Sequence, residues 1–340
     1  MSRAAARAAA VGLGLAGLVL GPACARLGLA RPALLVSDGR PCMGTVLEIT
    51  LLVESPAQGR ALLAELFALA DEIETLASRH APASQLSQLN AAAGRGPLRV
   101  DPRLARMLAE ARGYAAKTQG SFDVGVGPLV DLWSEAEQRG TAPDPDALAQ
   151  ARARVGASRI RVEGDLVELE PGMRLDLGGF AKGWTLDRMR ERLEAAGVRD
   201  AFLDFGQSSV LALGVPPDAP AWTLALRDGR GGVAGLVELR DASLSVSGSL
   251  GQSSEIGGVR YGHIVDPRSG MALTRNVQAA VVAESGAEAE AWSKALVVLG
   301  AAALPLVERE RGVEALLLDE DGRELPSSGW VQETHFQPIP

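Results

Sequence analysis

The chain has 340 residues, of which 47% are hydrophobic and 22% are charged, and its formal net charge is −8. A chain of this length and composition can bury enough apolar surface for one large or two modest globular domains, which excludes a disordered protein. It has no block of lysines and arginines, so sequence-independent binding to nucleic acid is excluded as its function. An anionic small ligand would need local donor groups.

The first 25 residues have the pattern of an export signal. Two arginines precede an uncharged run over residues 8–20, and the small residues of ACA at 23–25 suit cleavage by signal peptidase. The run is short for a membrane-spanning helix, so we expect a signal peptide over residues 1–25 rather than a membrane anchor. A lipid anchor on Cys24 is the alternative. The predicted location is the periplasm or the outer face of the cytoplasmic membrane, and Cys42 is left without a disulfide partner.

After the leader, the hydrophobic pattern alternates between the strand period of two and the helix period of about 3.6. Residues 46–53 are rich in β-formers, and apolar side chains over 62–76 mark one face of a long helix. An Asp-Pro cap begins a helix over 144–156, and a Gly-Asp turn predicts a hairpin over 159–170. The other predicted helices span 102–118, 180–196 and 287–299. The other predicted strands span 173–177, 201–205, 222–227, 236–240, 261–265, 278–283 and 314–318.

Hairpins mixed with helices favour one fold class, α+β with largely antiparallel sheets flanked by helices. A doubly wound parallel sheet would instead show strands and helices in strict alternation. No internal repeat, linker or low-complexity tract follows the leader, so we predict a single domain over residues 40–335.

Two glycine-rich stretches depart from ordinary core-and-loop patterns. QGSFDVGVGPLVDLW, residues 119–133, places glycines around Phe122 and Asp123, where backbone can approach a ligand closely or simply turn. RLDLGGFAKGWTLD, residues 174–187, leads through two glycines into a helix, so backbone N–H groups and Lys182 can meet a phosphate. It has neither the GxGxxG spacing of a dinucleotide fingerprint nor the spacing of a P-loop.

Three later stretches also combine strands with small polar residues. LDFGQSSVLALG at 203–214 and SLSVSGSLG at 243–251 fit either a ligand contact or a surface turn. RYGHIVDPRSG at 260–270 holds His263, one of only three histidines, three residues before Asp266. A lone histidine is often structural, but the strand-to-turn setting and the nearby acid suit a catalytic role equally well.

Together these stretches resemble the ApbE-type FAD:protein FMN transferases. The matching segments keep the family's order and are MGT (43–45), SQLSQLN (84–90), GSFDVGVGPLVDLW, DLGGFAKGW, the glycine at 206, SVSG (245–248), HIVDPRSG and AEAWSKALVVLG (289–300). The resemblance implies a fold related to the tunnelling fold, with FAD held in a cleft. It also implies transfer of FMN from FAD, through a phosphoester bond, to a Thr or Ser hydroxyl of an acceptor electron-transfer protein, with Mg²⁺ as cofactor and AMP released.

The resemblance also assigns residues. Its flavin contacts fall on Met43, His80, Ser121, Phe122, Asp123, Asp176, Lys182 and Ile264. His80 stands where many members have a tyrosine beside the flavin ring, and an imidazole can still stack there. The expected metal ligands fall on the carbonyl of Gly179 and the side chains of Glu290 and Lys294.

The expected catalytic group is a histidine. The resemblance places it at His263, which alone or with Asp266 could take the proton from the acceptor hydroxyl, since imidazole titrates near neutrality. Cations beside the diphosphate lower the barrier further, because the departing phosphate gains negative charge.

The metal site departs from the family pattern, because Lys294 stands where a threonine ligand is usual. An ammonium has three donors and no lone pair, so it cannot ligate Mg²⁺. Three outcomes remain open: Glu290 and the Gly179 carbonyl hold Mg²⁺ while Lys294 contacts phosphate, Lys294 replaces the metal, or the protein only binds or hydrolyses FAD. Residues four apart on a helix are neighbours, so an exposed Glu–Lys pair without function is the fourth reading.

Two further substitutions also indicate an altered ligand site. Val246 and Gly125 also stand where threonines are usual, which would remove two more hydroxyls from the ligand site. We therefore expect weakened or absent dependence on Mg²⁺.

Overall fold

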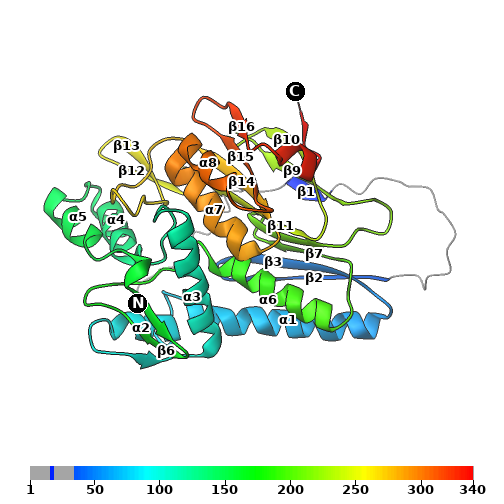
Figure 1. Ribbon diagram of the computed structural model, residues 1–340, viewed down its shortest axis with the longest axis horizontal. Helices are drawn as coiled ribbons and strands as arrows, with labels where there is room; N and C mark the ends of the chain where they lie inside the picture. Colours follow the sequence, from blue (N-terminus) through cyan, green and yellow to red (C-terminus); the bar gives the residue numbers. More distant parts are fainter. Residues whose placement is uncertain (1–15, 19–33, 340) are drawn as a thin grey trace, which may run out of the picture.

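The computed structural model describes residues 16–18 and 34–339 (Figure 1). The arginines of the predicted leader, its cleavage site and Cys24 lie outside these residues. Residues Ala16–Leu18 form a short strand, β1, which pairs antiparallel with β9 (Trp222–Arg227).

The centre of the molecule is an eight-stranded sheet in the order β16-β15-β14-β11-β8-β7-β3-β2. Its strands are β2 (Leu34–Cys42), β3 (Thr45–Val53), β7 (Ala201–Phe205), β8 (Ser209–Leu213), β11 (Ala242–Gly248), β14 (Gln278–Ala283), β15 (Glu314–Leu318) and β16 (Glu324–Pro326). All seven pairings within it are antiparallel, which confirms the predicted fold class.

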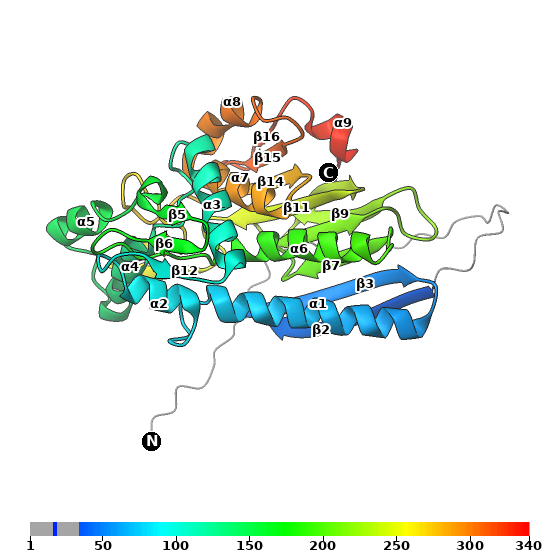
Figure 2. The same ribbon diagram turned by 60° about the horizontal axis from the view of Figure 1, so that its bottom comes forward.

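Long helices cover one face of this sheet, and a smaller sheet covers the other (Figures 1 and 2). The helices are α1 (Pro56–Ala77), α6 (Ala181–Ala195) and α7 (Gly286–Leu299). The smaller sheet contains β9, β10 (Val233–Leu239) and β17 (Gln337–Pro338). Successive side chains of a strand point to opposite faces of the sheet. Leu47, Ile49 and Leu51 of β3 therefore pack in the core under α1 and α6, and Leu52 packs toward the smaller sheet.

The remaining elements gather mainly at one end of the central sheet (Figure 1). They are α2 (Gln85–Ala91), β4 (Leu98–Arg99), α3 (Pro102–Lys117), α4 (Gly127–Arg139), α5 (Pro145–Arg152), the 3-10 turn Ala157–Arg159, β5 (Arg161–Glu163), β6 (Leu166–Glu168), β12 (Ser253–Ile256) and β13 (Val259–Gly262). The 3-10 turn Gly300–Ala303, α8 (Leu304–Val307) and α9 (Trp330–Thr334) lie near the C-terminus.

Most predicted elements are confirmed, and the exceptions have local causes. The predicted strand at 173–177 is an irregular segment with a single bridge, Arg174 to Val126. The second half of the glycine-rich stretch 119–133 belongs to helix α4, which begins at Gly127, has proline in its first turn and buries Leu129 and Trp133 on one face. The predicted helix 144–156 ends at Arg152, and the predicted strand 261–265 ends at Gly262.

One helical run in residues 34–339, Gly286–Val307, is long and apolar enough to cross a membrane by composition. Its first part is α7, which packs against α6, β11 and β14, and Trp292 within it is completely buried. Its apolar surface therefore serves the protein core.

Candidate active site

The glycine-rich segments lie side by side at one end of the sheet. Asn90 exchanges two hydrogen bonds with the backbone of Leu175, at 2.7 and 3.0 Å. The N–H of Asp176 donates to the carbonyl of Val124 at 2.8 Å. Gly206 lies against Thr45, and its N–H donates to the Val46 carbonyl at 2.9 Å. Segments separated by more than 50 residues thus form one backbone framework.

Helices α6 and α7 cross at their closest point through two glycines. A Cβ built on Gly183 would lie 2.5 Å from the carbonyl carbon of Gly286 and 2.6 Å from Cγ of Glu290. Asp187 of α6 then caps the first turn of α7, accepting from the N–H groups of Gly286 and Ala287 at 2.6 and 3.0 Å. The crossing fixes Glu290 beside the N-terminal turn of α6.

Glu290 is a fully buried carboxylate with both oxygens engaged. The Lys294 ammonium donates to Oε2, and the Ser209 hydroxyl donates to Oε1. The Lys294 side chain is 20% exposed, and its Cε lies 3.4 Å from where a Cβ on Gly179 would be. Burial, and then Lys182, lower the pKa of Lys294, so its ammonium form depends on the carboxylate beside it.

Lys182, at the start of α6, is a second lysine in the same region. Its Nζ donates to the hydroxyl of Ser208, in the turn that follows β7. Burial lowers the pKa of Lys182 to about 8, an effect that the nearby Asp204 carboxylate opposes. Burial also raises the pKa of Asp204 to about 6. At neutral pH Lys182 is therefore charged and able to meet an anion.

His263 has a defined tautomer. Its Nδ1 lies 3.1 Å from the backbone carbonyl oxygen of Gln252, which can only accept, so Nδ1 carries the proton and Nε2 keeps a lone pair. Although the ring is solvent-accessible, desolvation lowers its pKa, and the Lys294 and Lys182 ammonium groups lower it further against the opposing effect of the Gln252 bond. The imidazole is therefore neutral near pH 7 and suited to accept a proton at Nε2.

The predicted pairing of His263 with Asp266 is replaced by another contact. The Asp266 carboxylate binds the backbone N–H and guanidinium of Arg268 at 2.9 and 3.0 Å, which stabilises the turn after the histidine. The partner of His263 Nδ1 is instead the carbonyl of Gln252. No sequence pattern marks that carbonyl, because it belongs to a segment 11 residues away.

Asp176 has a partner that sequence reasoning missed. Arg79 donates to Asp176 Oδ2 at 2.6 Å and also binds Asp131. Arg79 directly precedes His80, an exposed residue, so the predicted flavin-stacking position adjoins an ion-pair network. The only sequence feature that could have indicated this ion pair is the basic character of Arg79, next to the predicted flavin contact His80.

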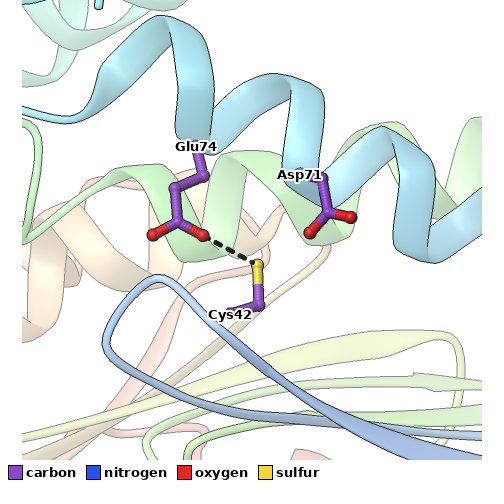
Figure 3. A group of neighbouring side chains, drawn as sticks. All are labelled: Cys42, Asp71 and Glu74. Atoms are coloured by element: carbon purple, nitrogen blue, oxygen red, sulfur yellow. Dashed lines mark hydrogen bonds between the residues drawn. The ribbon is translucent and has the colours of Figure 1, made fainter. Parts of the chain in front are cut away.

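Met43 sits at a tight turn that α1 supports. Its φ is 48°, and its N–H donates to Glu74 at 2.9 Å. Figure 3 shows Glu74 pointing toward the thiol of Cys42, which donates to the same oxygen at 3.5 Å, with Asp71 on the same helix. The three side chains form a group with metal-ligand spacing, but burial and Glu74 raise the pKa of Cys42 to about 12, so the thiol keeps its proton. The group supports the turn that carries Met43.

Four other predicted flavin contacts have structural partners. Ser121 is buried and donates to the Thr118 carbonyl at 2.7 Å. Phe122 is buried with its ring centroid 5.5 Å from that of Phe180. Asp123 accepts from Gly125 and Ala157, and Ile264 packs against the core beside α7. Contacts of residues 121–123 with a ligand would involve mainly backbone.

The interpretation of Val246 requires a correction. Val246 packs in the core between the central sheet and the smaller sheet, whereas Ser245 and Ser247 on the other face of β11 bond to Ser293 of α7. Gly125 lies against Asp123 and Gly156. The interpretation that Val246 removes a hydroxyl from the ligand site is therefore wrong, whereas the same interpretation of Gly125 stays a prediction.

The sequence of this chain is similar to those of a known protein family. A sequence model of the ApbE family matches residues 43–317. The chain belongs to the ApbE family of FAD:protein FMN transferases. The FAD:protein FMN transferase of Treponema pallidum is 33% identical over 311 residues, covering 85% of this chain and 86% of that protein. The one from Rhodobacter capsulatus is 36% identical over 303 residues, and the match spans 86% of this chain and 57% of that longer protein.

Solved ApbE structures have the same fold. The flavin transferase ApbE from Vibrio cholerae superposes with a TM-score of 0.77 at 26% identity, covering 88% of this chain and 99% of that chain. The ApbE protein of Thermotoga maritima superposes with a TM-score of 0.79 at 24% identity, with 88% and 99% coverage. The α+β, largely antiparallel ApbE architecture predicted from the sequence is thereby confirmed.

Proposed function

We propose that this chain transfers FMN from FAD to a Thr or Ser hydroxyl of an exported electron-transfer protein and releases AMP. Family membership supports the donor and the reaction class. The observation that carries the proposal is that Lys182 and the Glu290–Lys294 pair bind the neighbouring residues Ser208 and Ser209. His263, from a third segment, lies within electrostatic range of both ammonium groups. Two ammonium groups beside a neutral imidazole suit a diphosphate and an attacking hydroxyl.

The residues have complementary parts in the transfer. The acceptor oxygen forms a bond to the FMN phosphorus while the bond from that phosphorus to the bridging oxygen breaks, and AMP leaves with that oxygen. Nε2 of His263 takes the hydroxyl proton and passes it to solvent. Lys182 and Lys294 stabilise charge on the diphosphate as it moves toward AMP.

The family resemblance implies Mg²⁺, and the donor set does not fit that ion. Mg²⁺ prefers several oxygen ligands in octahedral geometry. Of the three expected ligands, Lys294 offers an ammonium, both Glu290 oxygens already accept from protein donors, and the Gly179 carbonyl remains. Glu290 belongs to no group of three His, Cys, Asp or Glu ligands in the described part of the chain.

Labelling an acceptor tests the function. The purified protein is incubated with FAD and a Thr-containing acceptor, and covalent flavin fluorescence is read on a denaturing gel while AMP is quantified. We expect labelling with equimolar AMP, and neither for His263→Ala or for an acceptor with that threonine replaced by alanine. The mismatch at Lys294 favours one second candidate, an FAD-hydrolysing or FAD-binding relative. AMP and free FMN without labelling would support hydrolysis, and unchanged FAD would support binding alone.

The leader supports export as the cellular setting. An acceptor would then be met in the periplasm or at the outer face of the cytoplasmic membrane, and the chain would touch a membrane only through its N-terminal segment or its acceptor. Mass spectrometry of the mature N-terminus distinguishes cleavage after Ala25 from a lipid on Cys24. An unprocessed cytoplasmic chain would contradict export.

A further inference from the structure

Glu290 is already neutralised by the protein itself. Its carboxylate is completely buried, and a buried charge without a partner is strongly destabilising. Lys294, one helical turn later, provides that partner, and Ser209 satisfies the second oxygen. A divalent cation would have to displace the ammonium from the same oxygen and would meet the positive charge of Lys294 and Lys182 nearby.

The ammonium of Lys294 keeps unused capacity. Of its three donors, one is engaged by Glu290, which leaves two for a ligand. Its side chain is 20% exposed and lies along Gly179, where the absence of a Cβ leaves the backbone open. Lys182 lies near this pair, because it donates to Ser208 while the next residue, Ser209, donates to Glu290. His263 lies within electrostatic range of both ammonium groups, which lower its pKa.

We propose that Lys294, held by Glu290, takes the place of a divalent cation, so that this site binds the diphosphate of FAD without Mg²⁺. The inference rests on FAD as the ligand of the proposed function, but it concerns binding and does not require transfer. A lysine ammonium is a compact point charge that binds phosphate well, as the metal otherwise would.

FAD binding in EDTA and in excess MgCl₂ tests the proposal directly. For the wild-type protein we expect dissociation constants equal within about twofold, and calorimetric titration of MgCl₂ into the FAD complex should give no stoichiometric heat beyond an FAD blank. Lys294→Thr restores an oxygen donor. It should bind FAD about 10- to 100-fold more weakly in EDTA, recover with MgCl₂, and bind one Mg²⁺.

Lys117→Thr is the matched control. Lys117 is 45% exposed and pairs with Glu288 and Glu310 outside the site, so its loss should change neither FAD affinity nor Mg²⁺ binding. The wild-type comparison decides the question even if Lys294→Thr fails to fold. One tightly bound Mg²⁺ per wild-type chain, with FAD affinity lost in EDTA, would overturn the proposal.

The outcomes separate this inference from the proposed function. Metal-free FAD binding without acceptor labelling or AMP would support the role of Lys294 and refute the transferase proposal. Transfer that requires Mg²⁺ would support the transferase and refute the role of Lys294. A protein that binds no FAD under either condition would refute both.

Discussion

The close crossing of α6 and α7 at Gly183 predicts that Gly183→Ala destabilises the protein, whereas the same substitution at Gly113 of α3 stabilises it. In Gly183→Ala the new Cβ would lie 2.5 Å from the Gly286 carbonyl carbon, where ordinary contact begins at 3.4 Å, so the helices must separate by roughly 1 Å. Overpacking lowers the free energy of unfolding by about 1–3 kcal/mol, and the value lies at the upper end here because the obstacle is backbone. The higher helix propensity of alanine raises it by about 1 kcal/mol. We expect a net loss of about 2 kcal/mol, or about 3 °C in Tm for a chain of this length.

Gly113→Ala provides the control within α3. A Cβ there meets nothing within 4 Å, so the helix should gain about 0.5–1 kcal/mol in free energy of unfolding. Urea unfolding followed by circular dichroism measures both variants. Because Cγ of Glu290 also lies in the path of the new methyl group, Gly183→Ala should weaken FAD binding as well. If Gly183→Ala is as stable as Gly113→Ala, the described helix crossing is incorrect.

Three further predictions concern single side chains. FAD affinity should fall as pH rises through about 8, because Lys182 loses the proton that attracts the diphosphate, and Lys182→Arg should weaken this alkaline limb in a fluorescence titration. Asp187→Ala should lower the free energy of unfolding by about 2 kcal/mol in urea, since the first turn of α7 loses its acceptor; an unchanged midpoint would refute the cap. Cys42 should resist thiol reagents at neutral pH until the protein unfolds, and rapid native labelling would contradict its raised pKa and burial.

Elements with a strong local pattern could be predicted from the sequence. Residues 46–53 alternate because β3 faces two cores, and α7 is bounded by Ser285 at its start and Gly300 at its end. The strand predicted at 173–177 failed for a tertiary reason. Asn90 and the Val124 segment satisfy its backbone, so no neighbouring strand is needed.

The site could be predicted only in part, because its contacts join distant segments. The order of the motifs located Lys182, His263 and Glu290, and the structure brings them together. Arg79 lies 97 residues from its partner Asp176, and no periodicity reports such a pair. Strand alternation in β11 shows that Val246 faces away from its serine neighbours, but which face meets α7 depends on packing.

A crystal structure of the protein with FAD, grown in EDTA, tests the central claim most directly. That claim is that Lys182, His263 and Lys294 surround one FAD diphosphate. We predict phosphate oxygens within hydrogen-bonding distance of both ammonium groups, no ion between Lys294 and the phosphates, and Nε2 of His263 facing the FMN phosphorus. A diphosphate bound away from Lys182 and Lys294, or an ion on Glu290 with Lys294 displaced, would contradict the account.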